Sequence, residues 1–185
     1  MKKQLISLLI LLMGSGYIYG QENIFNIGDK VMNFGIGFGS TLYSGTGYKT
    51  SVPPVSVSFE KGIIDEVLEK GVIGIGGYLA YAANKWEYLD WGYRYSRLIL
   101  AARGVFHYPL VDNFDTYTGI HLGYQVVRVK DIGNVNPLFN YNVSSSGVIW
   151  SWFAGARYYF SEDWAAFGEV GYGITYLNLG VAKRF

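Results

Sequence analysis

Residues 55–61 read Val-Ser-Val-Ser-Phe-Glu-Lys, and this stretch alternates apolar and polar side chains almost without a break. Successive side chains of a β-strand point to opposite faces, so the alternation predicts a strand with one apolar and one polar face. The same two-residue period recurs in seven other segments, separated by clusters of Gly, Asn, Asp, Pro and Ser. These segments are residues 31–42, 72–83, 93–108, 114–127, 148–160, 164–172 and 174–185. The chain is therefore predicted to be an all-β protein of eight strands.

The composition favours a membrane barrel over a soluble one. Of 185 residues, 25 are Gly, and charged residues make up 16%, well below the roughly 25% of soluble domains. The polar faces of the segments carry mostly Gly, Ser, Ala and Asn, which suits a narrow lumen, whereas a water-exposed exterior would need several charges on each strand. We therefore expect the apolar faces to contact lipid. A soluble sandwich or lipocalin-like barrel is the alternative.

The sheet is expected to close on itself. In lipid, an open edge would leave backbone N–H and C=O groups unpaired, at several kcal/mol for each group. Residues 134–146 are the only candidate for further strands, and Pro137 and the many Asn and Ser residues there argue against it. We expect an eight-stranded antiparallel up-and-down transmembrane β-barrel, as a monomer.

The start of the chain resembles an export signal in its layout. Basic residues at positions 2 and 3 precede a largely apolar stretch at 5–13 and small residues at 14–16. The apolar stretch is too short for a membrane-spanning helix, which needs about 20 residues. We predict a cleavable signal peptide over residues 1–20, with cleavage after Gly16 as the alternative to cleavage before Gln21. Residues 21–185 then form one barrel domain in the outer membrane of a Gram-negative bacterium.

Both termini of an even-stranded barrel lie on the periplasmic side, so the connections alternate in direction. The outward connections are predicted at residues 43–54, 84–92 and 128–147 and at a turn around Gly173, and the inward ones at 62–71, 109–113 and 161–163. Ile63, Ile64, Val67 and Leu68 have helical spacing, so one or two helical turns are expected at the inner rim.

Charged residues on the polar faces are expected to form an ion-pair network in the lumen, because an uncompensated buried charge is strongly destabilising. They are Glu60, Arg97, Arg103, Arg157 and Glu169. We expect Arg97 or Arg103 to pair with Glu60 or Glu169. Such a network would leave the lumen largely occluded. A small passive pore is the alternative, and it would need an aqueous path past these side chains.

Aromatic residues near segment ends are expected at the membrane interfaces, where amphipathic rings lie at headgroup level. They are Phe106, Tyr108, Trp150, Trp152, Tyr158 and Phe160. Trp86 and Trp91, in a predicted outward connection, are expected to be anchors of the same kind, with ligand contact as the alternative. The absence of Cys excludes disulfides and a lipoprotein anchor, and a net charge of +1 gives no electrostatic case for nucleic acid. No metal and no cofactor are expected.

The end of the chain carries a more specific pattern. Leu177, Leu179, Val181 and the terminal Phe185 occupy alternating positions, and residues 167–173 with 176–180 form a predicted hairpin. From residue 28 to the end, the sequence resembles the small eight-stranded outer-membrane barrels of the OmpA-transmembrane-domain and OmpX type. The resemblance implies that these four residues are an assembly signal for the outer-membrane insertion machinery. It also implies outer-membrane lipids as partners and a structural or surface-interaction role, with the surface ligand left open.

Some barrels of this kind, the lipid A palmitoyltransferase and deacylase, are enzymes that use Ser, His and acidic residues near the outer rim. Here His107 and His121 flank the predicted inward connection at 109–113, so both are expected at the opposite end. We therefore expect no enzyme. A lipid-modifying enzyme is kept as an alternative.

Overall fold

In the computed structural model, eight antiparallel strands form one closed barrel in chain order, and β1 closes the ring against β8. The structure describes residues 23–40, 48–88, 91–133 and 143–185, and the predicted signal peptide lies outside them. The strands are β1 (Lys30–Ser40), β2 (Tyr48–Val67), β3 (Gly71–Tyr88), β4 (Trp91–His107), β5 (Phe114–Gly133), β6 (Val143–Tyr159), β7 (Trp164–Tyr172) and β8 (Thr175–Arg184). The all-β, eight-stranded up-and-down prediction is confirmed. No helix within these ranges is both long and apolar enough to span a bilayer.

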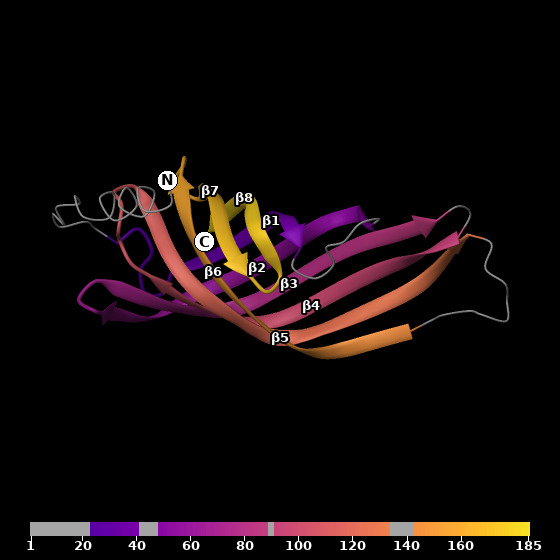
Figure 1. Ribbon diagram of the computed structural model, residues 1–185. Coiled ribbons are helices and arrows are strands. Elements are labelled where there is room, and N and C mark those ends of the chain that lie inside the picture. The colour runs from indigo at the N-terminus through magenta and orange to yellow at the C-terminus, as the bar shows by residue number, and fades with distance from the viewer. Residues whose placement is uncertain (1–22, 41–47, 89–90, 134–142) are drawn as a thin grey trace, which may run out of the picture.

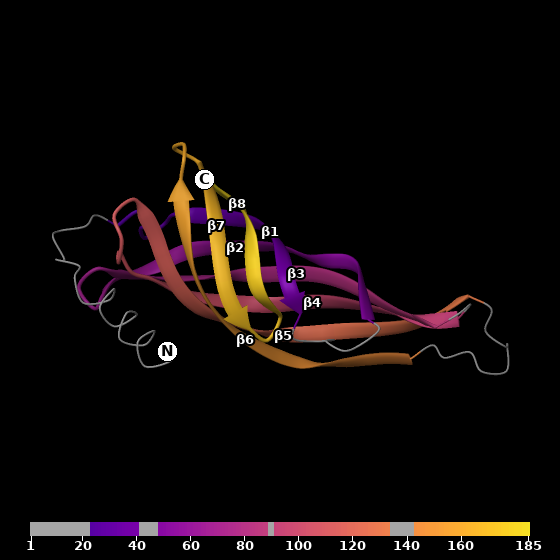
Figure 2. The same cartoon turned by 45° about the horizontal axis from the view of Figure 1, so that its top comes forward.

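The strands differ in length, so the wall of the barrel has two heights. Strands β2 to β6 contain 17 to 20 residues, whereas β7, β8 and β1 contain 9 to 11. In Figures 1 and 2, β3, β4, β5 and β6 run far beyond the end of the β7–β8 hairpin. We call the part of β2 to β6 beyond that hairpin the tall wall. At the hairpin itself the chain turns at Gly173, whose φ of 113° is rarely adopted by residues with a side chain.

The outward connections are much shorter than predicted. Most of residues 48–54, 84–92, 128–133 and 143–147 belongs to strands, so the prediction of long loops there was wrong. For example, Lys85 pairs with Arg94, and Trp86 pairs with Tyr93. The ladder continues because backbone hydrogen bonds do not depend on side-chain polarity. Polar and aromatic residues replace the apolar face here, and the apolar alternation therefore ends before the strands do.

The prediction of helical turns at residues 62–71 was also wrong. Strand β2 continues to Val67 and turns directly into β3, with Glu66, Leu68 and Glu69 at positive φ. Two register shifts interrupt this end of the β2–β3 ladder, between Gly62 and Ile64 and between Ile64 and Val67. A β-bulge inserts an extra residue and breaks the two-residue period. The resulting spacing of apolar residues imitates that of a helix.

The two faces of each strand point as the alternation predicted. Large apolar side chains are exposed on the outside of the barrel, as in Leu100 at 66% and Val148 at 74%. Of the six predicted interface aromatics, Trp150, Trp152, Tyr158 and Phe160 are exposed on this outer surface, and Phe106 and Tyr108 are half-buried. The charged residues of the opposite faces are buried inside the barrel. The outside is therefore apolar and the inside polar.

Candidate functional site: the ion-pair cluster in the lumen

One row of paired residues places several chemically active side chains at the same height in the lumen. Glu60 pairs with Gly76, Gly76 with Arg103, Arg103 with His121, and His121 with Ser151. These residues come from five consecutive strands. Except for Gly76, which is half-buried, they are all buried.

Arg103 lies at the centre of the cluster and uses all three of its guanidinium nitrogens. Its Nε donates to Glu60 Oε2 at 3.0 Å, and its Nη2 donates to Glu169 Oε1 at 2.6 Å. Its Nη1 lies 3.2 Å from Nε2 of His121. The guanidinium carbon also lies 4.0 Å from the ring centroid of Phe153, which is a cation–π distance. Arg103 therefore links β4 to β2, β5, β6 and β7.

Arg157 on β6 forms a second centre, closer to the end of the barrel with the connections at 109–113 and 161–163. We call this end the inner end. Nη1 of Arg157 donates to Asp115 Oδ2 at 2.6 Å, its Nε donates to Asn33 Oδ1 at 3.0 Å, and its Nη2 donates to Glu60 Oε1. Glu60 thus accepts from both arginines. Since each guanidinium is fully buried and bonded to carboxylates, neither charge is left uncompensated.

His107 and Tyr117 complete the cluster. Nδ1 of His107 lies 2.7 Å from Asp115 Oδ1, and its Nε2 lies 3.6 Å from Glu60 Oε1. The Tyr117 hydroxyl donates to Glu169 Oε1 at 3.0 Å. The cluster thus holds three carboxylates, two guanidinium groups and the imidazole of His107.

The five predicted lumen residues are all buried, and four of them meet in this cluster. Arg97 is the exception in position: it lies further along β4, opposite Ala82 and Val127, towards the outer rim. Sequence reasoning missed Asp115, which shares a strand face with Tyr117 and could have been found from that parity. It also left Asn33 unassigned to the network, because nothing in the sequence fixes which polar side chain an arginine across the lumen will meet.

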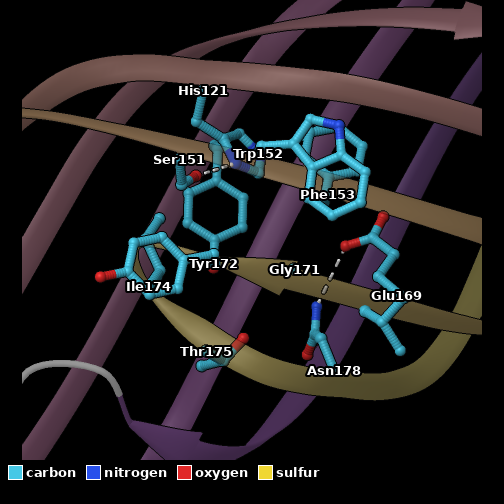
Figure 3. Close-up of a pocket in the computed structure, with 12 residues that line it drawn as sticks. His121, Ser151, Trp152, Phe153, Glu169, Gly171, Tyr172, Ile174, Thr175 and Asn178 are labelled. Atoms are coloured by element: carbon cyan, nitrogen blue, oxygen red, sulfur yellow. Dashed lines mark hydrogen bonds between the residues drawn. The ribbon is translucent and has the colours of Figure 1, made fainter. Parts of the chain in front are cut away.

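His121 and Ser151 form a close pair that resembles a nucleophile and its base, with Nδ1 2.8 Å from Oγ (Figure 3). Arginine can only donate, so the Arg103 contact makes Nε2 of His121 the acceptor. Nδ1 then carries the proton and donates to Ser151. A base must accept the proton of the nucleophile, and this arrangement does the reverse. The pair is therefore arranged as a structural hydrogen bond.

The inner end of the lumen is covered by the segment that precedes β1. Phe25 is 2% exposed and stacks on His107, with ring centroids 3.9 Å apart and an interplanar angle of 15°. Hydrogen bonds tie the segment to the barrel, among them those from Gly28 N to Gly62 O and from Arg184 Nη1 to Ile24 O. We call residues 23–29 the inner plug. No periodic pattern in the sequence predicts this segment.

The remaining site predictions concern assembly and metals. Leu177 is half-buried, while Leu179, Val181 and Phe185 are exposed on the outside of the barrel. Their role as an assembly signal stays a prediction. Within the described ranges, no group of three or more His, Cys, Asp or Glu residues is arranged to hold a metal ion.

Comparison with solved structures identifies the fold. The crystal structure of Ail, the attachment invasion locus protein of Yersinia pestis, matches with a TM-score of 0.53 and 13% identity, over 86% of this chain and 100% of that chain. Ail is an outer-membrane protein. The chain has the fold of a small outer-membrane barrel. At this identity the likeness shows the fold alone.

Two proteins of Pseudomonas aeruginosa match with slightly lower TM-scores. The N-terminal β-barrel domain of OprF matches with a TM-score of 0.49 and 14% identity, over 85% of this chain and 96% of that chain. The outer-membrane protein OprG matches with a TM-score of 0.49 and 11% identity, over 87% and 97%. No protein-family model matches the sequence, and no curated protein matches it.

Proposed function

We propose that the protein is an integral outer-membrane barrel with a closed lumen, which acts in the cell envelope as a structural or surface-interaction protein. The observation that carries this proposal is the double closure of the lumen. The ion-pair cluster fills its middle, and the inner plug covers its inner end. The cavity beside His121 and Glu169 has a volume of about 20 Å³, and the one beside Phe25 and His107 about 10 Å³.

These volumes argue against the passive-pore alternative. A cavity needs about 10–15 Å³ to hold one water molecule. Each of the two cavities has room for about one water, whereas a hydrated ion needs a continuous column. Conduction would therefore require the buried arginines and carboxylates to separate, at the cost of leaving charges unpaired in the lumen.

The outer surface has the height of a bilayer core. For a rise of about 3.3 Å per residue and a tilt of about 40°, the outward side chains of residues 98–108 cover roughly 25 Å. This matches the apolar band of an outer-membrane barrel. We propose outer-membrane lipids as partners of this surface, and the barrel assembly machinery as a partner during biogenesis.

The tall wall offers a surface for interaction. Tyr93 and Tyr95 share a strand face with buried Arg97, so they point to the inner side of the wall and not to lipid. Trp86 pairs with Tyr93 and lies on the same side, with ring centroids 5.4 Å from Trp91 and 6.4 Å from Tyr93. Tryptophan and tyrosine are the residues that most often dominate binding interfaces. We propose this aromatic face as the surface-interaction site.

Planar-bilayer recording tests the closed lumen. We expect no stable conductance steps from the purified wild-type protein, whose insertion is established separately by flotation with vesicles. Arg103→Ala combined with Phe25→Ala removes one centre of the cluster and the buried ring of the plug. We expect brief openings from this variant if a heat-modifiable gel shift shows that it is folded. Stable steps from the wild type would instead establish the pore.

Two further measurements test the other parts of the proposal. Fractionation of a Gram-negative host is expected to place the protein in the outer membrane, with a mature N-terminus at Gln21. Lipid A from the same cells is expected to be unmodified. A lipid A modification that disappears in the His121→Ala variant would establish the enzyme alternative.

A further inference from the structure

Near the outer rim, four cations occupy one row across four neighbouring strands. Lys49 on β2 pairs with Lys85 on β3, Lys85 with Arg94 on β4, and Arg94 with Lys130 on β5. Arg128 lies on the same face of β5, opposite Ser96. Arg94 shares its strand face with exposed Leu98 and Leu100, so the row points to the outside of the barrel.

This arrangement is unfavourable without an anion. Like charges directly opposite each other on neighbouring strands destabilise the pairing. Lys85 has a partner, since its Nζ lies 2.9 Å from Glu87 Oε1. Among the described residues, no carboxylate forms an ion pair with Arg94, Arg128 or Lys130.

The three cations surround a cavity on the outer surface. Its volume is about 470 Å³, and its lining divides into a polar and an apolar part. The polar part is Arg94, Ser96, Arg128 and Lys130, and the apolar part is Tyr81, Leu98 and Val126. A cavity that is cationic at one end and apolar at the other fits an amphiphile with an anionic headgroup.

The height of the cavity identifies which part of the membrane it faces. Leu98 and Val126 pair at the upper end of the apolar band, and the next outward pairs are Ser96 with Arg128 and Arg94 with Lys130. The cations thus begin where the apolar band ends. If the barrel spans the membrane as proposed above, they lie at the headgroups of the outer leaflet.

We propose that this cavity binds a phosphorylated glycolipid of the outer leaflet, of the lipid A type. Arg94, Arg128 and Lys130 hold a phosphate on its sugar headgroup, and Tyr81, Leu98 and Val126 contact the first part of its acyl chains. Arginine and lysine suit this role because both donate several hydrogen bonds to phosphate oxygens. This inference rests on the proposed membrane insertion and adds a specific lipid to it.

The test compares two variants that lose the same number of charges. The site variant carries Arg94→Gln, Arg128→Gln and Lys130→Gln. The control variant carries Lys30→Gln, Lys61→Gln and Lys183→Gln, which lie near the inner rim. Each purified protein is titrated in detergent with bisphosphorylated lipid A and, separately, with enzymatically dephosphorylated lipid A, and bound lipid is counted by native mass spectrometry.

We expect the site variant to bind bisphosphorylated lipid A about 10-fold or more weakly than the wild type, since each cation near an anionic lipid surface adds to the attraction. The control variant is expected to bind as the wild type does. Dephosphorylated lipid A is expected to bind weakly to all three proteins. If the triple variant fails the gel-shift test of folding, the single variant Arg94→Gln takes its place. We expect it to lose less of the affinity for bisphosphorylated lipid A.

Three outcomes would overturn the lipid site. They are equal binding by the site variant and the wild type, an equal loss in the control variant, and displacement of lipid A by soluble dextran sulfate at matched charge. Insertion into phosphatidylcholine vesicles is measured in parallel. If the wild-type protein inserts but binds both forms of lipid A equally, only the lipid site is contradicted. If it does not insert, the proposed function is contradicted as well.

Discussion

Arg103 on β4 donates a 2.6 Å hydrogen bond to Glu169 on β7, and these two strands are not neighbours in the barrel. The bond therefore crosses the lumen and joins a strand of the tall wall to the short β7–β8 hairpin. Both side chains are buried. The proposed closure of the lumen and the stability of the hairpin thus depend on the same contact.

Replacing Arg103 with Met is expected to destabilise the barrel by about 3–5 kcal/mol, because Glu60 and Glu169 lose a buried partner. Urea unfolding in phosphatidylcholine vesicles, followed by tryptophan fluorescence, measures the change. Adding Glu169→Gln should cost less in the Arg103→Met background than in the wild type, since the pair is coupled. Lys61→Met, at an exposed position, is the control and should change stability by no more than about 0.5 kcal/mol. Equal losses in Arg103→Met and Lys61→Met would show that the lumen pair contributes nothing.

Two adjacent glycines should respond in opposite ways to alanine. A Cβ on Gly76 would lie 1.7 Å from the backbone oxygen of Phe59, so the β2–β3 ladder beside Glu60 would have to move. A Cβ on Gly77 would meet nothing within 4 Å. We expect Gly76→Ala to destabilise the barrel by about 2 kcal/mol or more, as overpacking does. Gly77→Ala should be neutral or stabilising by up to about 1 kcal/mol. The same urea unfolding assay measures both changes. Similar losses of stability at both positions would contradict the tight contact at Gly76.

The two-residue period was enough to predict most of the fold and half of the site. It places Glu60, Arg103 and Arg157 on inner faces without reference to any other strand, since parity is a local property. It also gives the strand count, because each apolar face must pass the membrane once. The pairing of Arg103 with Glu60 and Glu169 was expected only as one of several combinations.

Relations between strands could not be predicted in this way. The contact of His121 with Ser151 depends on the register of β5 and β6, which local alternation does not encode. The tall wall was missed because its strands continue beyond the apolar band, with residues such as Trp86 and Tyr93 in place of aliphatic ones. The bulges near Ile64 changed the spacing of apolar residues, which made a strand look helical.

Phe185 should matter for assembly and not for stability. Its side chain is 64% exposed, and its backbone N–H donates to Lys30 O, a bond that alanine keeps. We expect Phe185→Ala to change the free energy of unfolding in vesicles by no more than about 0.5 kcal/mol. The amount of folded protein in the outer membrane of expressing cells should fall several-fold, because the proposed assembly signal is lost. Leu110→Ala, which removes an exposed apolar side chain from an inner turn, is the control. A normal membrane level of Phe185→Ala would contradict the signal.

The outward orientation of the apolar faces can be measured directly, because the chain contains no Cys and single labels are simple to place. Leu100→Cys puts a nitroxide in the middle of the outer surface, and Glu87→Cys puts one on the exposed upper part of β3. In vesicles, the label at residue 100 should collide with oxygen and be protected from a water-soluble nickel chelate, because oxygen concentrates in the acyl chains. The label at residue 87 should show the opposite ratio. Nickel access to residue 100 equal to that at residue 87 would mean that this surface faces water, as the soluble-barrel alternative requires.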